Sequence, residues 1–123
     1  MTSTLPRRRK HQRTKPLPER VRCPGHLAWV RGHECAVIGR RGHKCGGPMQ
    51  AAHARVGTDG AGSVKPGDNW TIPLCAIAHQ HQHFLGETSF EQTFGIDMKR
   101  IAAALWDRSP HKIKWEMKQR ESA

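Results

Sequence analysis

A cysteine followed by three histidines at alternate positions is the part of this sequence best suited to metal chemistry. The stretch CAIAHQHQHFLG spans residues 75–86 and contains His79, His81 and His83. Imidazole nitrogens bind divalent ions such as Zn, Mn and Ni. On a strand all three side chains would line one face, whereas on a helix His79 and His83 share a face and His81 points away. The local structure therefore decides which histidines can bind one ion.

A helix is the favoured structure for this segment. Residues 78–85 contain no β-branched side chain, nearby alanines favour a helix, and Gly86 is a typical helix end. We therefore expect His79 and His83 to hold a metal ion together and His81 to be dispensable. The alternative is a pair of surface histidines on a polar helix without a metal.

The elements before this helix would bring a further histidine near the pair. The sequence predicts a strand over 49–56 that contains His53, then a glycine-rich loop, then a strand over 70–75 with the letters WTIPLC. This order of strand, loop, strand and helix can hold one divalent ion between the helix and the strands. Such an ion stabilises the charge that develops when a phosphodiester is attacked, and a neutral histidine can accept a proton from the attacking water.

Flanking helices complete the α+β fold that we expect. A helix is predicted from Pro24 to Gly32, and a brief strand over 36–39 follows it. Two more helices follow the histidine segment. One covers 88–95 with a capping box at its start, and the other begins after Asp97 as its N-cap.

The composition indicates a polyanionic partner. The chain has 123 residues, a formal net charge of +11 and 36% hydrophobic residues, which favours one small domain that binds nucleic acid. No apolar run could span a bilayer and no secretory signal is visible, so we expect a cytoplasmic protein without a membrane partner. The predicted divisions are a disordered basic arm over 1–22, a domain over 23–108, and a charged tail or helix over 109–123.

The arm is the first candidate for contact with DNA. Its basic residues, which we expect to contact phosphates, are Arg7, Arg8, Arg9, Lys10, Arg13 and Lys15. The alternative is a solvated tail that keeps the protein soluble. Lys65, in the long loop, is a further candidate for a phosphate contact, although charged turns are usually only solvated.

Five stretches together resemble the HNH, or ββα-metal, nucleases, and above all the small phage and prophage members that include the recombination-enhancement (Ref-like) nucleases. They are HLAWVRGHECAVIG, AAHAR, GSVKPGDNWTIPLC, HQHQH followed by LGE, and FGIDMKRIAAALW, which cover residues 26–106 in the family's order. The run K-P-x-D-x-x-x-x-P-L-C followed by H-x-x-x-H is the most specific part. The resemblance implies a ββα-metal core with flanking helices and a metal-dependent endonuclease that hydrolyses DNA.

By position, the resemblance also implies roles for individual residues. His53 matches the histidine that acts as general base in the family. His79 and His83 match the ligands of one divalent ion, which could be Zn, Mn, Ni or Mg. Asp68 or Asn69 stands near the polar residue that orients the base.

One departure from the family pattern concerns the catalytic metal. Ala52 stands directly before the matched base, where relatives often carry a further metal ligand. The ion would then rest on His79 and His83 with water and phosphate, or His53 would itself be a ligand.

A second departure concerns a structural zinc that relatives often carry. Cys35 and Cys75 match two of its ligands, but Ile38 and Ala78 occupy the other two positions. Two nearby donors could substitute, namely His43 and Cys45. The simpler interpretation is that this zinc has been lost and that the remaining cysteines are ordinary thiols.

Three functions of different classes fit these observations. The leading one is an HNH endonuclease in which Arg55, just after the matched base, lies beside the DNA backbone. Ala52 keeps open a non-catalytic nucleic-acid-binding module on the same scaffold. The third is a basic accessory protein that needs a partner, such as a recombinase filament or a phage packaging machine, to become active.

Overall fold

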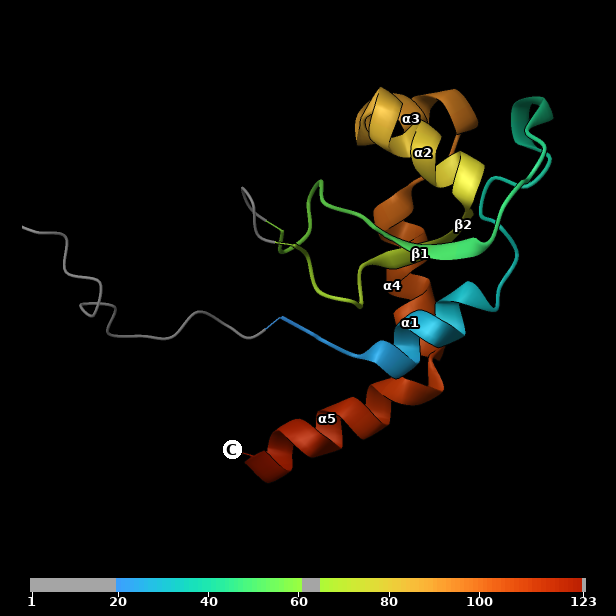
Figure 1. The fold of residues 1–123 in the computed structure, drawn as a ribbon. Helices are drawn as coiled ribbons and strands as arrows, with labels where there is room; N and C mark the ends of the chain where they lie inside the picture. Colours follow the sequence, from blue (N-terminus) through green and yellow to red (C-terminus); the bar gives the residue numbers. More distant parts are fainter. Residues whose placement is uncertain (1–19, 61–64, 123) are drawn as a thin grey trace, which may run out of the picture.

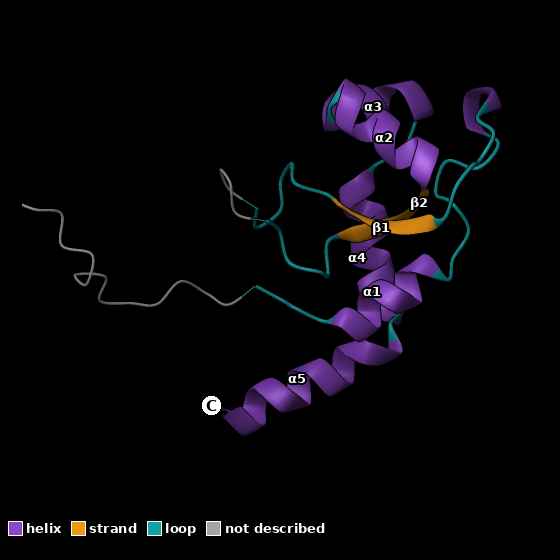
Figure 2. Cartoon of the chain, in the orientation of Figure 1, coloured by secondary structure: helices purple, strands orange, loops and turns teal. Residues whose placement is uncertain are grey.

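A two-stranded antiparallel sheet surrounded by helices forms the centre of this computed structural model, which describes residues 20–60 and 65–122 (Figure 1). In chain order, the elements are α1 (Pro24–Arg31), the 3-10 turn η2 (Arg40–Gly42), β1 (Met49–His53), β2 (Thr71–Cys75), α2 (Ala76–Leu85), α3 (Glu87–Phe94), α4 (Met98–Arg108) and α5 (Pro110–Ser122). Figure 2 shows how helices dominate around this short hairpin. The fold is therefore small and mixed α+β, as the sequence predicts. Across the described ranges, no helix combines the length and the apolar character needed to cross a bilayer.

The hairpin is the part of the fold that organises the rest. Its strands pair antiparallel, with Met49 opposite Cys75 and His53 opposite Thr71. All five residues of β2 are buried, because α1, α2 and α4 each pack against this strand. In the view of Figure 1, α2 and α3 lie above the sheet, α1 lies below it and α4 runs behind it. The hydrophobic core combines both strands with these helices through buried side chains such as Ile72 and Phe90.

Several predicted elements are confirmed with small changes at their ends. The first helix ends at Gly32, the two strands cover Met49–His53 and Thr71–Cys75, and α2 ends at Gly86. Asp97 caps α4, since its side chain accepts a hydrogen bond from the backbone N–H of Arg100 at 3.1 Å. These are the places where local residue preferences and tertiary packing favour the same structure.

The predicted strand over 36–39 is wrong. Its backbone turns instead, with hydrogen bonds of 3.0 Å from the N–H of Ile38 to Cys35 O and from the N–H of Arg40 to Val37 O. Gly39 has a left-handed backbone with φ +70°, which a strand cannot contain. The turn therefore replaces the strand because this glycine reverses the chain immediately after a short apolar run.

The predicted capping box of α3 is also wrong. The helix begins at Glu87 with Gly86 as its N-cap, before Thr88, and no side chain caps it. Glu91, the expected acidic partner in the capping box, instead accepts a hydrogen bond from the backbone N–H of Met98 at 2.7 Å. It therefore fixes the start of the next helix rather than the start of its own.

Residues just before the predicted domain boundary at residue 23 pack against the rest of the domain. Val21 O accepts a hydrogen bond from the N–H of Asp68 at 2.8 Å, and the Arg22 guanidinium donates to Pro66 O at 2.8 Å. Residues 20–22 are thus held against the loop before β2. The predicted DNA contacts of the arm (Arg7, Arg8, Arg9, Lys10, Arg13 and Lys15) lie outside the described residues. At the other end, the helical alternative for the charged tail is confirmed by α5.

A glycine fixes the approach of the Cys45 loop to α2, and this makes a testable prediction. Gly47 has φ +79°, and a Cβ there would lie 2.6 Å from Cβ of Ala76. Gly39 shares the left-handed backbone but faces open space in the described structure. We expect Gly47→Ala to lower the free energy of unfolding by about 3 kcal/mol, from backbone strain plus overpacking, and Gly39→Ala by about 1 kcal/mol from strain alone. Urea unfolding measures both, and equal losses would show that α2 does not press on this loop.

Candidate functional site

Two histidines on one face of α2 direct ring nitrogens at each other. Nε2 of His79 and Nε2 of His83 are 3.2 Å apart. Nδ1 of His79 lies 2.7 Å from Oε1 of Gln50 on β1. Because the amide oxygen only accepts hydrogen bonds, Nδ1 of a neutral His79 carries the proton and Nε2 keeps its lone pair. A histidine held in this way is oriented as metal-ligating histidines usually are.

Electrostatics favour the same neutral form of His79. Burial lowers the pKa of this imidazole, and the nearby rings of His83 and His53 lower it further because like charges would repel. Metal ions bind the neutral ring, so protons compete for His79 less than for an ordinary exposed histidine.

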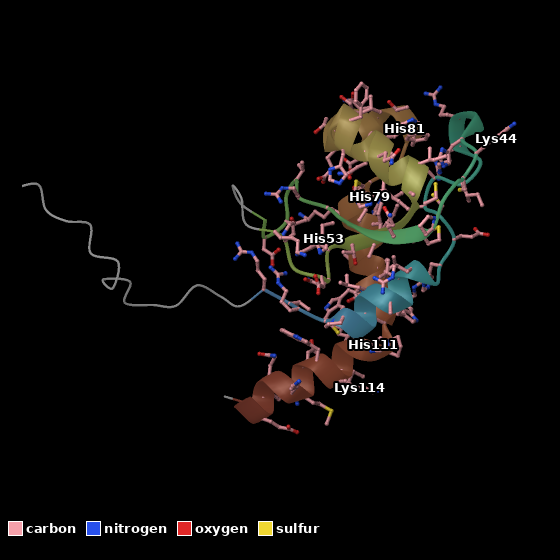
Figure 3. The ribbon with its side chains drawn as sticks, in the orientation of Figure 1. Lys44, His53, His79, His81, His111 and Lys114 are labelled. Atoms are coloured by element: carbon pink, nitrogen blue, oxygen red, sulfur yellow. The ribbon has the colours of Figure 1, made fainter. Side chains whose placement is uncertain are left out.

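His81 takes no part in this pair, as the helix prediction requires. It is exposed, and its ring centroid lies 6.5 Å from that of His43, away from His79. Figure 3 shows His81 farther along α2 and His79 nearer the strand that carries His53. The helical structure of the segment and the separate direction of His81 are both confirmed.

His53, the last residue of β1, forms a hydrogen bond with a buried carboxylate. Its Nε2 lies 3.1 Å from Oδ1 of Asp68, a residue that is 4% exposed. The other carboxylate oxygen accepts from the N–H of Cys23 at 2.8 Å, and Arg22 lies 3.9 Å from Oδ1. A carboxylate only accepts hydrogen bonds, so Nε2 of the neutral ring carries the proton and Nδ1 keeps a lone pair. The contact therefore leaves one ring nitrogen of His53 able to accept a proton.

The same contacts keep Asp68 ionised. Burial acts to raise the pKa of this carboxyl, but the hydrogen bonds from His53 and Cys23 and the charge of Arg22 outweigh it, so the pKa lies below its usual value. Of the two orienting candidates, Asp68 is thus the one that contacts His53. Asn69 is turned elsewhere, and within the part of the chain that the structure describes its Oδ1 is buried without a hydrogen-bond partner.

His53 and the His79–His83 pair line one cavity of about 400 Å³. Residues that line it include the predicted base His53, the predicted metal ligands His79 and His83, and the predicted DNA contacts Arg55 and Lys65. Gln82, which the sequence did not single out, lines it as well. The carboxylate of Glu87 accepts hydrogen bonds from the N–H of Arg55 at 2.8 Å and of Val56 at 3.1 Å, which fixes the chain just after His53. A larger cavity, of about 690 Å³ between α3 and α4, contains none of the predicted site residues.

Ala52 has a different role from the one its position in the family pattern implies. Its side chain is fully buried in the hydrophobic core. The residue therefore serves core packing and offers no donor atom to an ion at His79 and His83.

A second group of metal-binding side chains lies at the start of α2. One ligand atom from each member lies within 4.8 Å of the others, and the members are Cys35, His43, Cys45 and Cys75. Cys75 caps α2, since its sulfur accepts a hydrogen bond from the N–H of Ala78 at 3.4 Å. Nε2 of His43 is 3.3 Å from the same sulfur. Four donors at these separations could hold one metal ion.

The thiols of Cys75 and Cys45 in this group differ in acidity. Burial acts to raise the pKa of Cys75, but hydrogen bonds from the amides of Ala78 and Gly46 and from His43 outweigh it and lower the pKa to about 6. Desolvation and the neighbouring Cys35 and Cys75 sulfurs raise the pKa of Cys45 to about 12. Cys75 is therefore the thiolate that forms most readily when a cation approaches.

This group supports the alternative that two other donors replace the missing zinc ligands, over the simpler interpretation that the zinc was lost. Cys35 and Cys75 are joined by the two substitutes considered from the sequence, His43 and Cys45, while Ile38 is 50% exposed and takes no part. The signal in the sequence is the spacing H-x-C followed by two glycines. Gly46 O accepts from the N–H of Ile77 at 3.2 Å, so the glycine pair brings the ligand loop against α2.

Comparison with known proteins identifies the family. A family model described as "Protein of unknown function (DUF968)" matches residues 9–111. The chain belongs to the DUF968 family. Neither a curated protein nor a solved structure matches it. The matched region of the DUF968 family contains His53 and the His79–His83 pair. It also contains the four side chains that we call the cysteine–histidine group, namely Cys35, His43, Cys45 and Cys75.

One prediction from this site concerns the cysteine–histidine group of this DUF968 chain. A strong chelator should lower the unfolding temperature by roughly 10 °C or more, as expected when about 2 kcal/mol is lost from a domain of this size. Cys45→Ser, at an exposed ligand, should reduce the metal content and make unfolding insensitive to chelation. Cys23→Ala, at a cysteine outside the group, should retain the metal. Elemental analysis and thermal unfolding measure these effects, and identical wild-type curves with and without chelator would contradict the prediction.

Another prediction from this site concerns the stabilising effect of Asp68. Its pKa is lower in the folded protein than in the unfolded chain, so its stabilising effect is present above the unfolded pKa and is lost as the pH falls through the folded pKa. Asp68→Asn should lower the free energy of unfolding by about 2 kcal/mol near pH 7, with the difference from wild type shrinking below about pH 4. Asp107→Asn, at an exposed ion pair with Lys112, is the control and should have little effect at any pH. A difference for Asp68→Asn that stays constant down to about pH 2 would overturn this account.

Proposed function

We propose that this DUF968 protein is a metal-dependent endonuclease of the HNH, or ββα-metal, type that hydrolyses phosphodiester bonds in DNA. The observation that carries the proposal is that His53, which Asp68 holds by a hydrogen bond, lines one cavity together with the His79–His83 pair. The order of hairpin and helix supports the ββα assignment, because β1 carries the proposed base and α2 the proposed metal ligands.

The chemistry follows from the hydrogen bonds at His53. Nδ1 accepts a proton from water while the water oxygen attacks phosphorus and the bond to the leaving oxygen breaks. The Asp68 carboxylate holds the ring through Nε2 and stabilises the imidazolium that forms. Arg55 and Lys65, at the same cavity, neutralise the neighbouring phosphates.

The residues present fit a divalent ion at His79 and His83. Two facing imidazoles, one of them oriented by Gln50, suit Zn, Mn or Ni better than Mg, which prefers oxygen donors. When bound, such an ion would polarise a phosphate oxygen and stabilise the charge that develops in hydrolysis. His79 and His83 would hold the ion in the cavity that the proposed base also lines.

We assign a structural role to the cysteine–histidine group. Three thiols and one imidazole are donors that zinc prefers, and four protein ligands leave no open position for substrate. Zinc there would join the Cys35 turn and the Cys45 loop to the first turn of α2. It therefore supports the site through the placement of the helix and takes no part in the reaction.

DNA is the proposed partner because of the charge of the chain and of the cavity. The net charge of +11 favours association with a polyanion, and two basic side chains line the cavity that holds the proposed base. Helix α5 adds further basic residues at the far end of the molecule, among them Lys114 in Figure 3.

Nicking of supercoiled plasmid by the pure protein tests this function. With Mn²⁺ present, His53→Ala should cut about 10² to 10⁴-fold more slowly than the parent, because loss of a general base costs that much, while DNA binding persists. His81→Ala removes an exposed histidine from the opposite side of α2 and should cut at the parental rate. Equal rates for the two variants would overturn the assignment of His53, and a parent that does not cut with any divalent ion would overturn the function.

A further inference from the structure

One buried polar group at the cavity has no explanation within the fold. Gln82 is 6% exposed and lines the same cavity as His53, His79 and His83. Its Oε1 is buried without a hydrogen-bond partner among the described residues. Folded proteins rarely leave such a group unpaired, because it loses its hydrogen bonds to water and gains none in return.

The position of Gln82 on α2 indicates what could satisfy it. Residues 79, 82 and 83 are related by i, i+3 and i+4 spacing, so they share one face of the helix. That face carries the two imidazoles whose Nε2 atoms are 3.2 Å apart. Rotation about the last side-chain bond exchanges the amide oxygen and nitrogen, so the oxygen can turn toward the cavity while the rest of the side chain stays in place.

A further protein donor would strengthen the binding of an ion at His79 and His83, and the other candidates nearby have different roles. Catalytic metal sites commonly have three protein ligands. Ala52 has no donor, and the Glu87 carboxylate accepts from the backbone of Arg55 and Val56. His53 is bonded to Asp68 through Nε2, and in the proposed function its Nδ1 accepts the proton of the attacking water. An amide oxygen is a suitable ligand for Mn²⁺ and other hard divalent ions.

We propose that the amide oxygen of Gln82 is the third protein ligand of the divalent ion bound by His79 and His83. The inference rests on the proposed function for the existence of that ion. It explains why the helix carries a buried amide at this position, and it supplies the donor that Ala52 does not.

The test is a titration with Mn²⁺ of the full chain that holds one equivalent of zinc, which the three thiols and His43 take up first, and the EPR signal of free Mn²⁺ reports binding without any cleavage assay. Mn²⁺ favours nitrogen and oxygen donors over thiols, so the cysteine–histidine group contributes little to the signal. Gln82→Met keeps a similar shape but replaces the amide oxygen with a thioether sulfur, a poor ligand for Mn²⁺, and should weaken binding about 10 to 100-fold. Gln92→Met, at an exposed glutamine on α3, is the matched control and should bind as the parent does.

Urea unfolding with and without Mn²⁺ shows whether Gln82 acts as a metal ligand or only as a packing residue. Without Mn²⁺, Gln82→Met should unfold at a urea concentration equal to or above that of the parent, because it removes an unpaired buried amide. With saturating Mn²⁺ the order should reverse. Should Gln82→Met not fold, Gln82→Asn keeps the amide but shortens its reach, and the same loss of affinity is expected.

The outcomes separate this inference from the proposed function. Unchanged Mn²⁺ affinity in Gln82→Met or Gln82→Asn, together with a strong loss in His79→Ala, would overturn the role of Gln82 and leave the nuclease proposal standing. Affinity that His79→Ala does not change would overturn both, because the ion would then bind elsewhere.

Discussion

The direct junction between β2 and α2 at Cys75 is the constraint on which the candidate site depends. Cys75 is the last residue of the strand, pairs with Met49 across the hairpin, and caps the helix through its sulfur. No linker residue separates the two elements, so the direction of α2 is set by the sheet. The helix therefore carries His79 and His83 over β1, where Gln50 contacts His79 and where His53 ends the strand.

The two groups proposed to bind metal are related to this junction in different ways. The cysteine–histidine group surrounds the first turn of α2, with Cys75 as both helix cap and thiolate. The imidazole pair lies further along the same helix, beside the cavity. In the proposed function, a metal ion bound by three thiols and one imidazole holds the helix in place. The ion at the imidazole pair keeps coordination positions for phosphate and water. Helix α2 thus contacts the proposed structural metal group at its start and carries the proposed catalytic ligands further along.

Local sequence features predict the hairpin and α2 well. The strand with Thr71 and Ile72 is rich in β-branched residues, and the histidine segment lacks them and stops at Gly86. The spacing of His79 and His83 then follows from helix geometry alone. By contrast, the AVIG turn depends on one left-handed glycine, which the apolar pattern conceals.

Contacts between distant parts of the chain are what the sequence does not reveal. The choice of Asp68 over Asn69 depends on the N–H of Cys23 and on Arg22, which lie more than forty positions earlier. The cysteine–histidine group forms because the loop with His43 and Cys45 folds back onto α2, and the H-x-C spacing alone does not show that this loop meets Cys35 and Cys75. The burial of Gln82 is visible only once α2 is packed against the hairpin.

Anomalous X-ray diffraction from crystals of the full chain grown with Mn²⁺ tests the central claim most directly. The account predicts a manganese peak about 2 Å from Nε2 of both His79 and His83, on the side of the cavity that His53 lines. A map without manganese at this histidine pair, or with manganese only among Cys35, His43, Cys45 and Cys75, would contradict it.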